Sequence, residues 1–214
     1  MNASAEYFES RFTHNDDRLK VWRHVVRHLQ PFIDPTLPFV ELGAGYCEVS
    51  SCVAGPTIIV VDLREDLERW APVGAKVVVG SCTDLSDIGD KTVGTVFASN
   101  LLEHLTKEDV RATMAEVRRV LAPGGHFIVM QPNFRLASKR YFDDFTHETI
   151  FTDESLTDLV MASGFDIARR ENRFLPFSMK TKGSSLTFLV PWYLRSPIRP
   201  FAGQMLVVGQ KPGR

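Results

Sequence analysis

Residues 38–47 of the chain are PFVELGAGYC, and residues 57–62 are TIIVVD. Both begin as short apolar runs rich in β-branched side chains, which is typical of strands buried in a parallel sheet. The first run ends at Gly43, Ala44 and Gly45, where glycine lets the backbone turn tightly and approach a ligand closely. The second run ends on Asp62. These stretches predict two parallel strands, one ending in a glycine turn and the other on an acid.

Apolar runs alternate with amphipathic stretches along the rest of the chain. Strands that alternate with helices form parallel sheets through right-handed crossovers, so the pattern predicts an α/β fold. Ligands of such sheets bind beyond the carboxyl ends of the strands. We expect further strands at 75–79, 93–98, 126–131, 165–173 and 204–210, and helices at 16–30, 46–54, 65–70, 106–121 and 152–163.

The composition excludes several classes of protein. The chain has 214 residues, 44% of them hydrophobic, and a formal net charge of −1, which fits one folded domain and excludes a disordered tail. The absence of a basic surplus argues against a dedicated nucleic-acid binder. Cys47, Cys52 and Cys82 form no CxxC or Cys/His cluster, so we expect reduced thiols and no zinc site built on them. The polar N-terminus and the lack of a membrane-length apolar run predict a cytoplasmic protein.

Polar residues follow the predicted strands at the edge where a ligand is expected. Asp84 follows the third strand and Asn100 the fourth; Asp84 is suited either to accept the amino group of an adenine or to cap a helix. Asp62, about 20 residues after the glycine turn, is suited to accept both hydroxyls of a ribose. The turn lacks the last glycine of GxGxxG, and Glu48 stands there instead. A carboxylate would repel a pyrophosphate, which argues against a nicotinamide-dependent dehydrogenase.

A set of motifs resembles, in order and spacing, those of class I S-adenosylmethionine-dependent methyltransferases. They are ELGAG at 41–45, Asp62, DL at 84–85, SNLLEHL at 99–105 and RVLAPGG at 119–125. The resemblance covers residues 38–170. It implies a Rossmann-like fold, with a mostly parallel seven-stranded sheet and helices on both faces. It also implies S-adenosyl-L-methionine as cofactor and S-adenosyl-L-homocysteine as its product.

The same resemblance assigns residues to parts of the cofactor. The methionine moiety would lie against the glycine turn and the end of the fourth strand, the ribose against the end of the second strand, and the adenine after the third. One departure is Cys47, where many members have a third glycine; because cysteine is small, we expect cofactor binding to persist. The implied cofactor-binding residues are Glu41, Gly43, Ala44, Gly45, Asp62, Leu63, Asp84, Leu85, Asn100 and Leu101.

His147 is the leading catalytic candidate. Methyl transfer is an in-line displacement in which the protein supplies alignment and sometimes a base. A hydroxyl acceptor benefits from a base whose pKa is near neutral, most often histidine. His147 lies in YFDDFTHE at 141–148, after the fifth strand, with Asp143 and Asp144 close enough in sequence to orient it and raise its pKa. The alternative is a loop histidine with only a structural role.

Other histidines and acids carry weaker expectations. His104 belongs to SNLLEHL beside Glu103, and a structural contact at the start of a helix is the favoured alternative for it. His126 alternates within a strand and is expected to be structural, whereas His14 lies in a polar segment that would have to fold over the cofactor. The acids near His147 are compatible with a divalent metal, but the sequence shows no clear ligand set.

Residues 174–203 are too long for an ordinary hairpin between the last two strands. This stretch is aromatic and contains Lys180, Lys182, Arg195 and Arg199. It is interpreted either as a cap that completes the core or as an amphipathic platform for a membrane surface or a lipid-linked acceptor. Together with the motifs above, it also resembles a bacterial methyltransferase subgroup associated with glycan biosynthesis, which implies methylation of a sugar hydroxyl.

We therefore expect a single methyltransferase domain over residues 1–214. Its parts are an N-terminal helical lid (1–31), a cofactor-binding core (38–173), an acceptor-side insertion (174–203) and a last strand with a tail (204–214). The expected activity is O-methylation of a saccharide or glycolipid acceptor, with peripheral membrane contact and no nucleic acid. The alternatives are an N- or O-methyltransferase for a small metabolite and a non-catalytic cofactor-binding domain.

Overall fold

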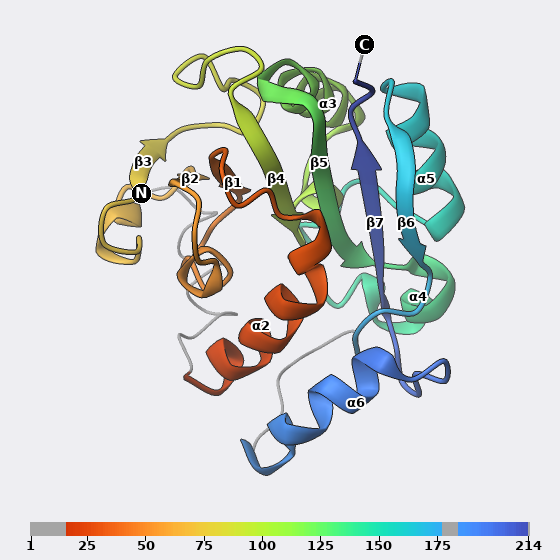
Figure 1. Cartoon of the computed structure of the whole chain (residues 1–214). Helices are drawn as coiled ribbons and strands as arrows, with labels where there is room; N and C mark the ends of the chain where they lie inside the picture. The colour runs from red at the N-terminus through yellow and green to blue at the C-terminus, as the bar shows by residue number, and fades with distance from the viewer. Residues whose placement is uncertain (1–15, 177–183, 214) are drawn as a thin grey trace.

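The structure is a computed structural model that describes residues 16–176 and 184–213. In these ranges the strands form one seven-stranded sheet in the order β3-β2-β1-β4-β5-β7-β6 (Figure 1). Strand β7 runs antiparallel to β5 and β6, and the other neighbours are parallel. The mostly parallel, Rossmann-like sheet expected from the sequence is therefore confirmed. The strands are β1 Phe39–Leu42, β2 Ile58–Asp62, β3 Lys76–Val79, β4 Val93–Ser99, β5 Leu121–Pro132, β6 Asp166–Glu171 and β7 Gln204–Gln210.

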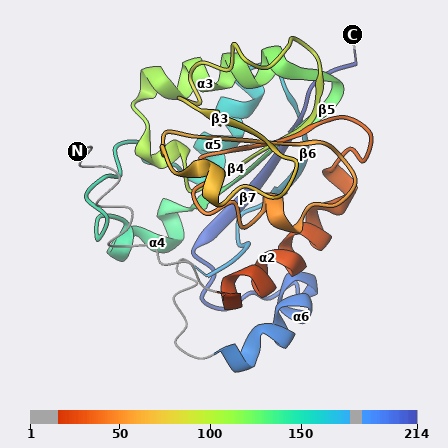
Figure 2. The same cartoon turned by 90° about the vertical axis from the view of Figure 1, so that its left-hand side faces the viewer.

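Helices cover both faces of the sheet. Helices α3 and α5 pack on one face, and α2 and α6 lie on the other (Figure 2). Two predicted helix starts are confirmed in detail, because the Thr106 hydroxyl accepts the Asp109 amide of α3 and Thr152 forms a capping box with Ser155 of α5. The α-helices are α2 Asp16–Leu29, α3 Lys107–Val120, α4 Phe134–Tyr141, α5 Asp153–Ala162 and α6 Val190–Arg195. The 3-10 helices are η1 Gln30–Phe32, η2 Ser50–Cys52, η3 Leu67–Arg69, η4 Leu102–His104 and η5 Ser184–Leu189.

Two predicted helices are wrong. Residues 46–54 form turns and the short η2, because Gly45 and Cys47 both take left-handed backbone conformations, with φ of 52° and 54°, and interrupt any regular helix. Residues 65–70 form only the single turn η3, whose Trp70 indole donates to Asp66. Conversely, α4 lies in a stretch where no helix was expected, with Asn133 as its cap.

The described part of the expected lid is a core helix. Trp22, Val25, Val26 and Leu29 of α2 are buried against the sheet. Helix α2 also contacts the segment after the glycine turn, because the Trp22 indole donates to Glu48 at 3.1 Å. Residues 1–15, with His14, lie outside the described residues.

The C-terminal insertion is fastened to the core by Arg199. Residues 174–203 were expected to form either a cap on the core or a surface platform, and Arg199 fits the cap, because its guanidinium is buried and pairs with Glu171 of β6. Glu171 also accepts from His28 of α2 at 3.0 Å. This ion pair therefore ties the insertion, the sheet edge and α2 together. Lys180 and Lys182 lie outside the described residues. No helix in the described ranges is long and apolar enough to cross a membrane.

Replacing Arg199 by methionine should destabilise the fold, because it leaves Glu171 buried without its main partner. We expect a loss of about 3 kcal/mol in the free energy of unfolding, measured with urea. The matched control is Arg195→Met on the exposed side of α6, which should change that free energy by less than about 0.5 kcal/mol. Equal effects of the two substitutions would contradict this account of the insertion.

Candidate functional site

The glycine turn after β1 is held by the end of β2. The Asp62 carboxylate accepts the Gly45 amide at 2.7 Å, and the Gly43 amide donates to the Val61 carbonyl at 2.9 Å. Gly43 has a φ of 63°, and a Cβ there would lie 3.0 Å from Leu101 Cδ1. The turn therefore presents bare backbone at the carboxyl edge of the sheet, where the sequence analysis placed the methionine part of the cofactor.

The buried residues Glu41 and Cys47 lie next to this turn. Glu41 is almost fully buried and accepts the Ser50 amide at 2.8 Å. Burial raises the pKa of Glu41 to about 7, although the hydrogen bonds from Ser50 oppose the shift. Cys47 is fully buried in a left-handed conformation that glycine adopts without cost. The departure from a third glycine is thus accommodated by strained backbone.

The residues expected at the ribose and the adenine lie in different environments. Leu63, next to Asp62, is 65% exposed and presents apolar surface at the end of β2. Asp84 is exposed, and its carboxylate accepts the Ser86 amide within a turn. No helix begins at Asp84, so the helix cap left open above is not formed. Leu85 is fully buried in the core and its amide donates to Glu116. Its side chain therefore packs beneath α3 and is not presented at the edge.

Asn100 is fixed at the end of β4. It has a φ of 49°, an uncommon conformation that is enriched at functional sites. Its amide oxygen accepts from Gln204 of β7 at 3.1 Å, and its amide nitrogen donates to Ser99. Leu101 follows and packs against Gly43. The end of β4 is therefore in direct contact with the glycine turn of β1.

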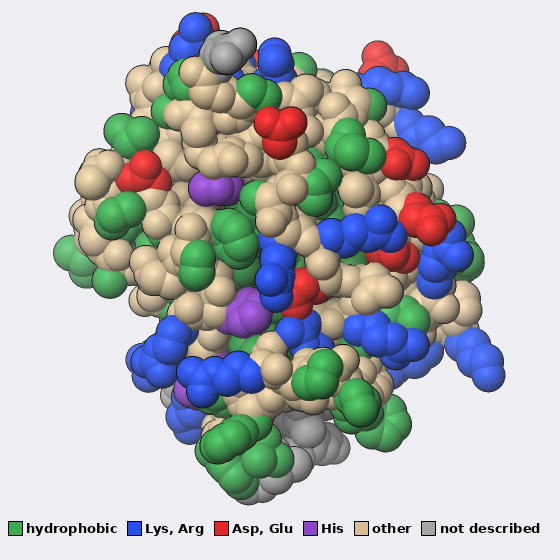
Figure 3. Space-filling view, turned by 45° about the vertical axis from the view of Figure 1, so that its right-hand side comes forward, with side chains coloured by type: hydrophobic (Ala, Val, Ile, Leu, Met, Phe, Trp, Pro, Cys, Tyr) green, Lys and Arg blue, Asp and Glu red, His purple; other side chains and the backbone are tan. Residues whose placement is uncertain are grey.

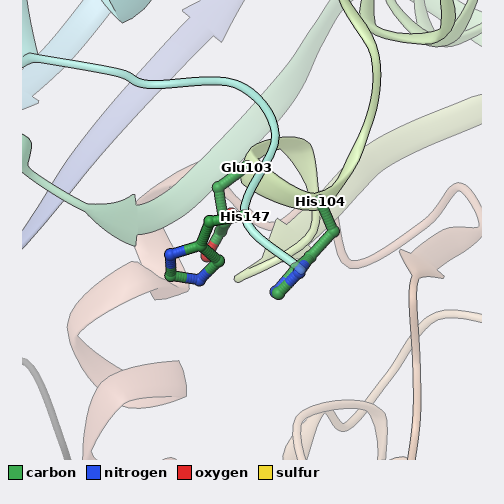
Figure 4. Close-up of side chains that lie close together, drawn as sticks. All are labelled: Glu103, His104 and His147. Carbon is green, nitrogen blue, oxygen red and sulfur yellow. The ribbon is translucent and has the colours of Figure 1, made fainter. Parts of the chain in front are cut away.

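Three ligand-type side chains converge immediately beyond Asn100. Glu103 and His104 come from η4, and His147 comes from the loop that faces it (Figure 4). One oxygen or ring nitrogen from each lies within 4.8 Å of those of the other two. The ring centroids of His104 and His147 are 4.8 Å apart, and those of Tyr141 and His147 are 4.5 Å apart. The structure thus brings His147 and His104 together, which the sequence analysis had listed separately.

Hydrogen bonds hold the loop of His147 against η4. The Glu103 carbonyl accepts the amides of Glu148 at 2.8 Å and Thr149 at 3.1 Å. The Thr149 hydroxyl donates to the Leu105 carbonyl, and the buried Tyr141 hydroxyl donates to the Thr149 carbonyl. The relative positions of Glu103, His104 and His147 are therefore fixed by backbone as well as by packing.

The expected supporting acids occupy distinct positions. Asp144 is buried and accepts from both the amide and the hydroxyl of Thr146, at 3.1 and 2.6 Å. The Thr146 hydroxyl also contacts His104 Nδ1 at 2.8 Å, so Asp144 is linked to His104 through Thr146. Asp143 is exposed and lies 3.7 Å from the Arg140 guanidinium.

Glu103 was named from the sequence as a candidate acid, whereas Gln131, Thr146 and Tyr141 were not candidates. Burial raises the pKa of Glu103 to about 8. Gln131, at the end of β5, is fully buried, and its amide has no hydrogen-bond partner among the described residues. Thr146 and Tyr141 support the histidines. Glu103 was visible as part of SNLLEHL, whereas Gln131 lies in an ordinary-looking strand and gives no sequence signal.

Comparisons with known proteins agree with this arrangement. Residues 40–129 match a family model described as a methyltransferase domain. A SAM-dependent methyltransferase from Archaeoglobus fulgidus is 17% identical, with a TM-score of 0.69 over 98% of this chain and 100% of that one. A possible histamine N-methyltransferase from Thermotoga maritima is 18% identical, with a TM-score of 0.67 over 96% and 98%. A comparison with curated proteins gives no match.

A further similar structure carries ligands. The 1,6-didemethyltoxoflavin-N1-methyltransferase of Burkholderia thailandensis, solved with 1,6-didemethyltoxoflavin and S-adenosylhomocysteine, is 16% identical, with a TM-score of 0.64 over 98% of this chain and 85% of that one. The family model matches 90 of the 214 residues, and the three structures share the fold of this chain. S-adenosylmethionine is the cofactor that the resemblance in the sequence implies. The bare glycine turn, Asp62 and the exposed Leu63 fit such a cofactor, since they offer close backbone, a carboxylate and apolar surface at one edge.

The buried Glu41 should make the stability of the cofactor-free protein depend on pH. Unfolded chains lose the Glu41 proton near pH 4.5, whereas the folded protein keeps it to about pH 7. Stability from this group is therefore complete below pH 4.5 and falls as the pH rises to 7, by about 3 kcal/mol. Urea unfolding over this range should show a decline in wild type that is about 3 kcal/mol larger than in Glu41→Gln, because the raised pKa of Glu103 gives both proteins a decline of its own.

The matched control for this measurement is Glu68→Gln, which changes an exposed carboxylate of η3. It should retain the wild-type decline. The account of Glu41 fails if wild type and Glu41→Gln lose stability in parallel between pH 4.5 and 7.

Proposed function

We propose that this methyltransferase transfers the methyl group of S-adenosylmethionine to a hydroxyl of a saccharide or glycolipid acceptor. The observation that carries the proposal is the group of Glu103, His104 and His147 beside Asn100. A hydroxyl must lose its proton as it is methylated, and imidazole is the side chain best suited to promote this near neutral pH. An amine acceptor with a neutral lone pair needs no such group.

The cofactor, when bound, supplies a methyl group activated by a positively charged sulfur. The protein's part is to align the acceptor oxygen and to manage its proton. We assign this to His147, with direct proton transfer to its ring as the simplest route. Asp144 supports the site by holding Thr146 against His104, and Asp143 lies on the outer side of the same loop. Glu103 lies close to both imidazoles and would stabilise positive charge on them once it has lost its own proton.

A small-metabolite N- or O-methyltransferase is the alternative function. Two of the similar structures are described by N-methyl transfer to small molecules. The paired histidines favour the hydroxyl acceptor, because their chemistry serves proton removal. A binding-only domain would have no use for them.

We further propose that the acceptor is lipid-linked and that the insertion rests on a membrane surface. Large hydrophobic side chains are exposed on and around α6, among them Trp192, which is 73% exposed, and Phe201, which is 91% exposed. Hydrophobic side chains gather at the lower end of the molecule, where α6 lies, and Lys and Arg side chains border them (Figure 3). Apolar side chains bordered by basic ones suit an anionic bilayer. The other large exposed side chains of this surface are Phe188, Leu189 and Ile198.

A screen of mono- and oligosaccharides with methyl-labelled cofactor should find an acceptor that gains an O-methyl group. His147→Ala should lower turnover of that acceptor by at least about 100-fold. Its affinity for S-adenosylhomocysteine, measured by calorimetry, should stay within about twofold, because His147 lies beyond the residues that contact the cofactor in the proposal.

The matched control is His24→Ala on α2, which should retain wild-type turnover. Unchanged turnover in His147→Ala would remove it from the acceptor site. A screen in which amines are methylated and hydroxyls are not would favour the small-metabolite alternative.

Sedimentation with liposomes tests the membrane surface. Wild type should bind vesicles containing anionic lipid, and the double variant Trp192→Ala, Phe201→Ala should lose most of that binding because it removes exposed apolar area. Val73→Ala is the control, since Val73 is fully exposed on the loop before β3. The surface role is wrong if wild type stays in the supernatant or if the double variant sediments like wild type.

A further inference from the structure

We propose that Glu103, His104 and His147 form a binding site for one divalent transition-metal ion of the Zn²⁺ or Mn²⁺ type. Two imidazoles and one carboxylate are ligands that such ions accept. The oxygen and nitrogen atoms that these residues offer already lie within 4.8 Å of one another. Around a tetrahedral ion with bonds of about 2.1 Å, ligand atoms are roughly 3.4 Å apart, so binding draws the three groups slightly together.

The strongest indication is Glu103 itself. It is only 1% exposed, and neither of its carboxylate oxygens has a hydrogen-bond partner among the described residues. A buried carboxylate without partners is costly, and native proteins keep such groups where a ligand compensates them. The side chain reaches from η4 to the two imidazoles (Figure 4). A cation at this point would supply the missing partner for both oxygens.

His104 is oriented for metal binding. The Thr146 hydroxyl donates its single proton to Asp144 at 2.6 Å, so in its 2.8 Å contact with His104 Nδ1 it is the acceptor. Nδ1 therefore carries the hydrogen, and the lone pair is on Nε2. Metal-bound histidines are commonly held in this way, with the other ring nitrogen donating toward a carboxylate. Thr146 and Asp144 would thus set the tautomer of His104.

The loop geometry makes the site preorganised. Both ligands from η4 and the ligand from the facing loop are fixed by the two amides that donate to the Glu103 carbonyl. The Tyr141 ring packs against His147 from the interior. Metal binding therefore requires no folding of a new segment, only a small adjustment of three side chains.

The consequence for the reaction rests on the proposed function. Three protein ligands leave a coordination position for an acceptor hydroxyl, and metal coordination lowers the pKa of a bound hydroxyl toward neutrality. The hydroxyl proton would pass to water, the carbon–oxygen bond would form, and the carbon–sulfur bond of the cofactor would break. His147 would then act as a metal ligand and no longer as the direct proton acceptor.

Metal binding is tested on the full chain after removal of metals with a chelator. Titration calorimetry with ZnCl₂ and with MnCl₂ should show one saturable site per chain. Glu103→Gln and His147→Gln should each weaken binding by at least about 100-fold. Thr146→Val, which keeps the ligands but loses the orienting hydroxyl, should weaken it by about 10-fold or more.

The matched controls are Glu108→Gln and His24→Gln, at an exposed glutamate of α3 and a partly exposed histidine of α2. Both should bind metal like wild type. The proposal is overturned if wild type shows no saturable binding or if Glu103→Gln and His147→Gln bind like wild type. Circular dichroism and S-adenosylhomocysteine binding establish that each variant is folded. If Glu103→Gln does not fold, His147→Gln and Thr146→Val carry the test.

Activity separates this inference from the proposed function. Metal binding that depends on the three residues, without O-methylation of any acceptor, would leave the site standing and overturn the function. Full-rate O-methylation by protein that has been shown to be metal-free would overturn the role of the metal in activating the hydroxyl. We expect EDTA to abolish turnover and added Zn²⁺ or Mn²⁺ to restore it.

Discussion

The parallel pairing of β1 with β4 fixes where the candidate site forms. These strands are neighbours in the sheet, with Leu42 beside Ala98, although more than fifty residues separate them in the chain. The chain turns to one side of this pair for β2 and β3 and to the other for β5, and ligands of such sheets bind where the order reverses. Gly94 permits the close packing at the start of β4, since a Cβ there would lie 2.5 Å from that of Asp34. The register then brings the glycine turn and Asn100 together.

Buried charge is used in two different ways in this fold. Burial alone would raise the pKa of Glu171, but hydrogen bonds from His28 and Arg199 lower it to about 2, and the resulting ion pair fastens the insertion. Glu103 is also buried, but neither of its carboxylate oxygens has a hydrogen-bond partner among the described residues. The first carboxylate is satisfied by the protein and serves stability. A cation or an imidazolium would supply the partner that the second carboxylate lacks, which is why we propose the acceptor chemistry there.

The sequence predicts the sheet well because its signals are local. Apolar β-branched runs mark buried strands, and Thr106 and Thr152 mark helix starts through hydrogen bonds to residues three positions away. It predicts the region after the glycine turn poorly, because nothing in the local sequence marks the left-handed conformation that the buried Cys47 adopts. The sequence also leaves the burial of Arg199 open, for a related reason. Its partner Glu171 is 28 positions away, and no periodic pattern connects them.

The candidate site shows the same division between local and distant information. The motif SNLLEHL indicated polar residues at the end of a strand, and YFDDFTHE indicated a histidine in a loop. That the two motifs meet depends on hydrogen bonds between the loop and η4, across more than forty residues. The pairing of Glu103 and His104 with His147 could therefore be found only in three dimensions, as could the link from Asp144 through Thr146 to His104.

The proposed function requires the cofactor's methyl group and the histidine pair to face each other at one edge of the sheet. Imidazole NMR spectra of the ¹⁵N-labelled protein, recorded during titration with S-adenosylmethionine, test it directly. The ring signals of His104 and His147 should shift as the cofactor saturates its site, whereas those of His126, which packs against Phe32, should not move. Saturable cofactor binding that leaves both His104 and His147 unchanged would contradict the account.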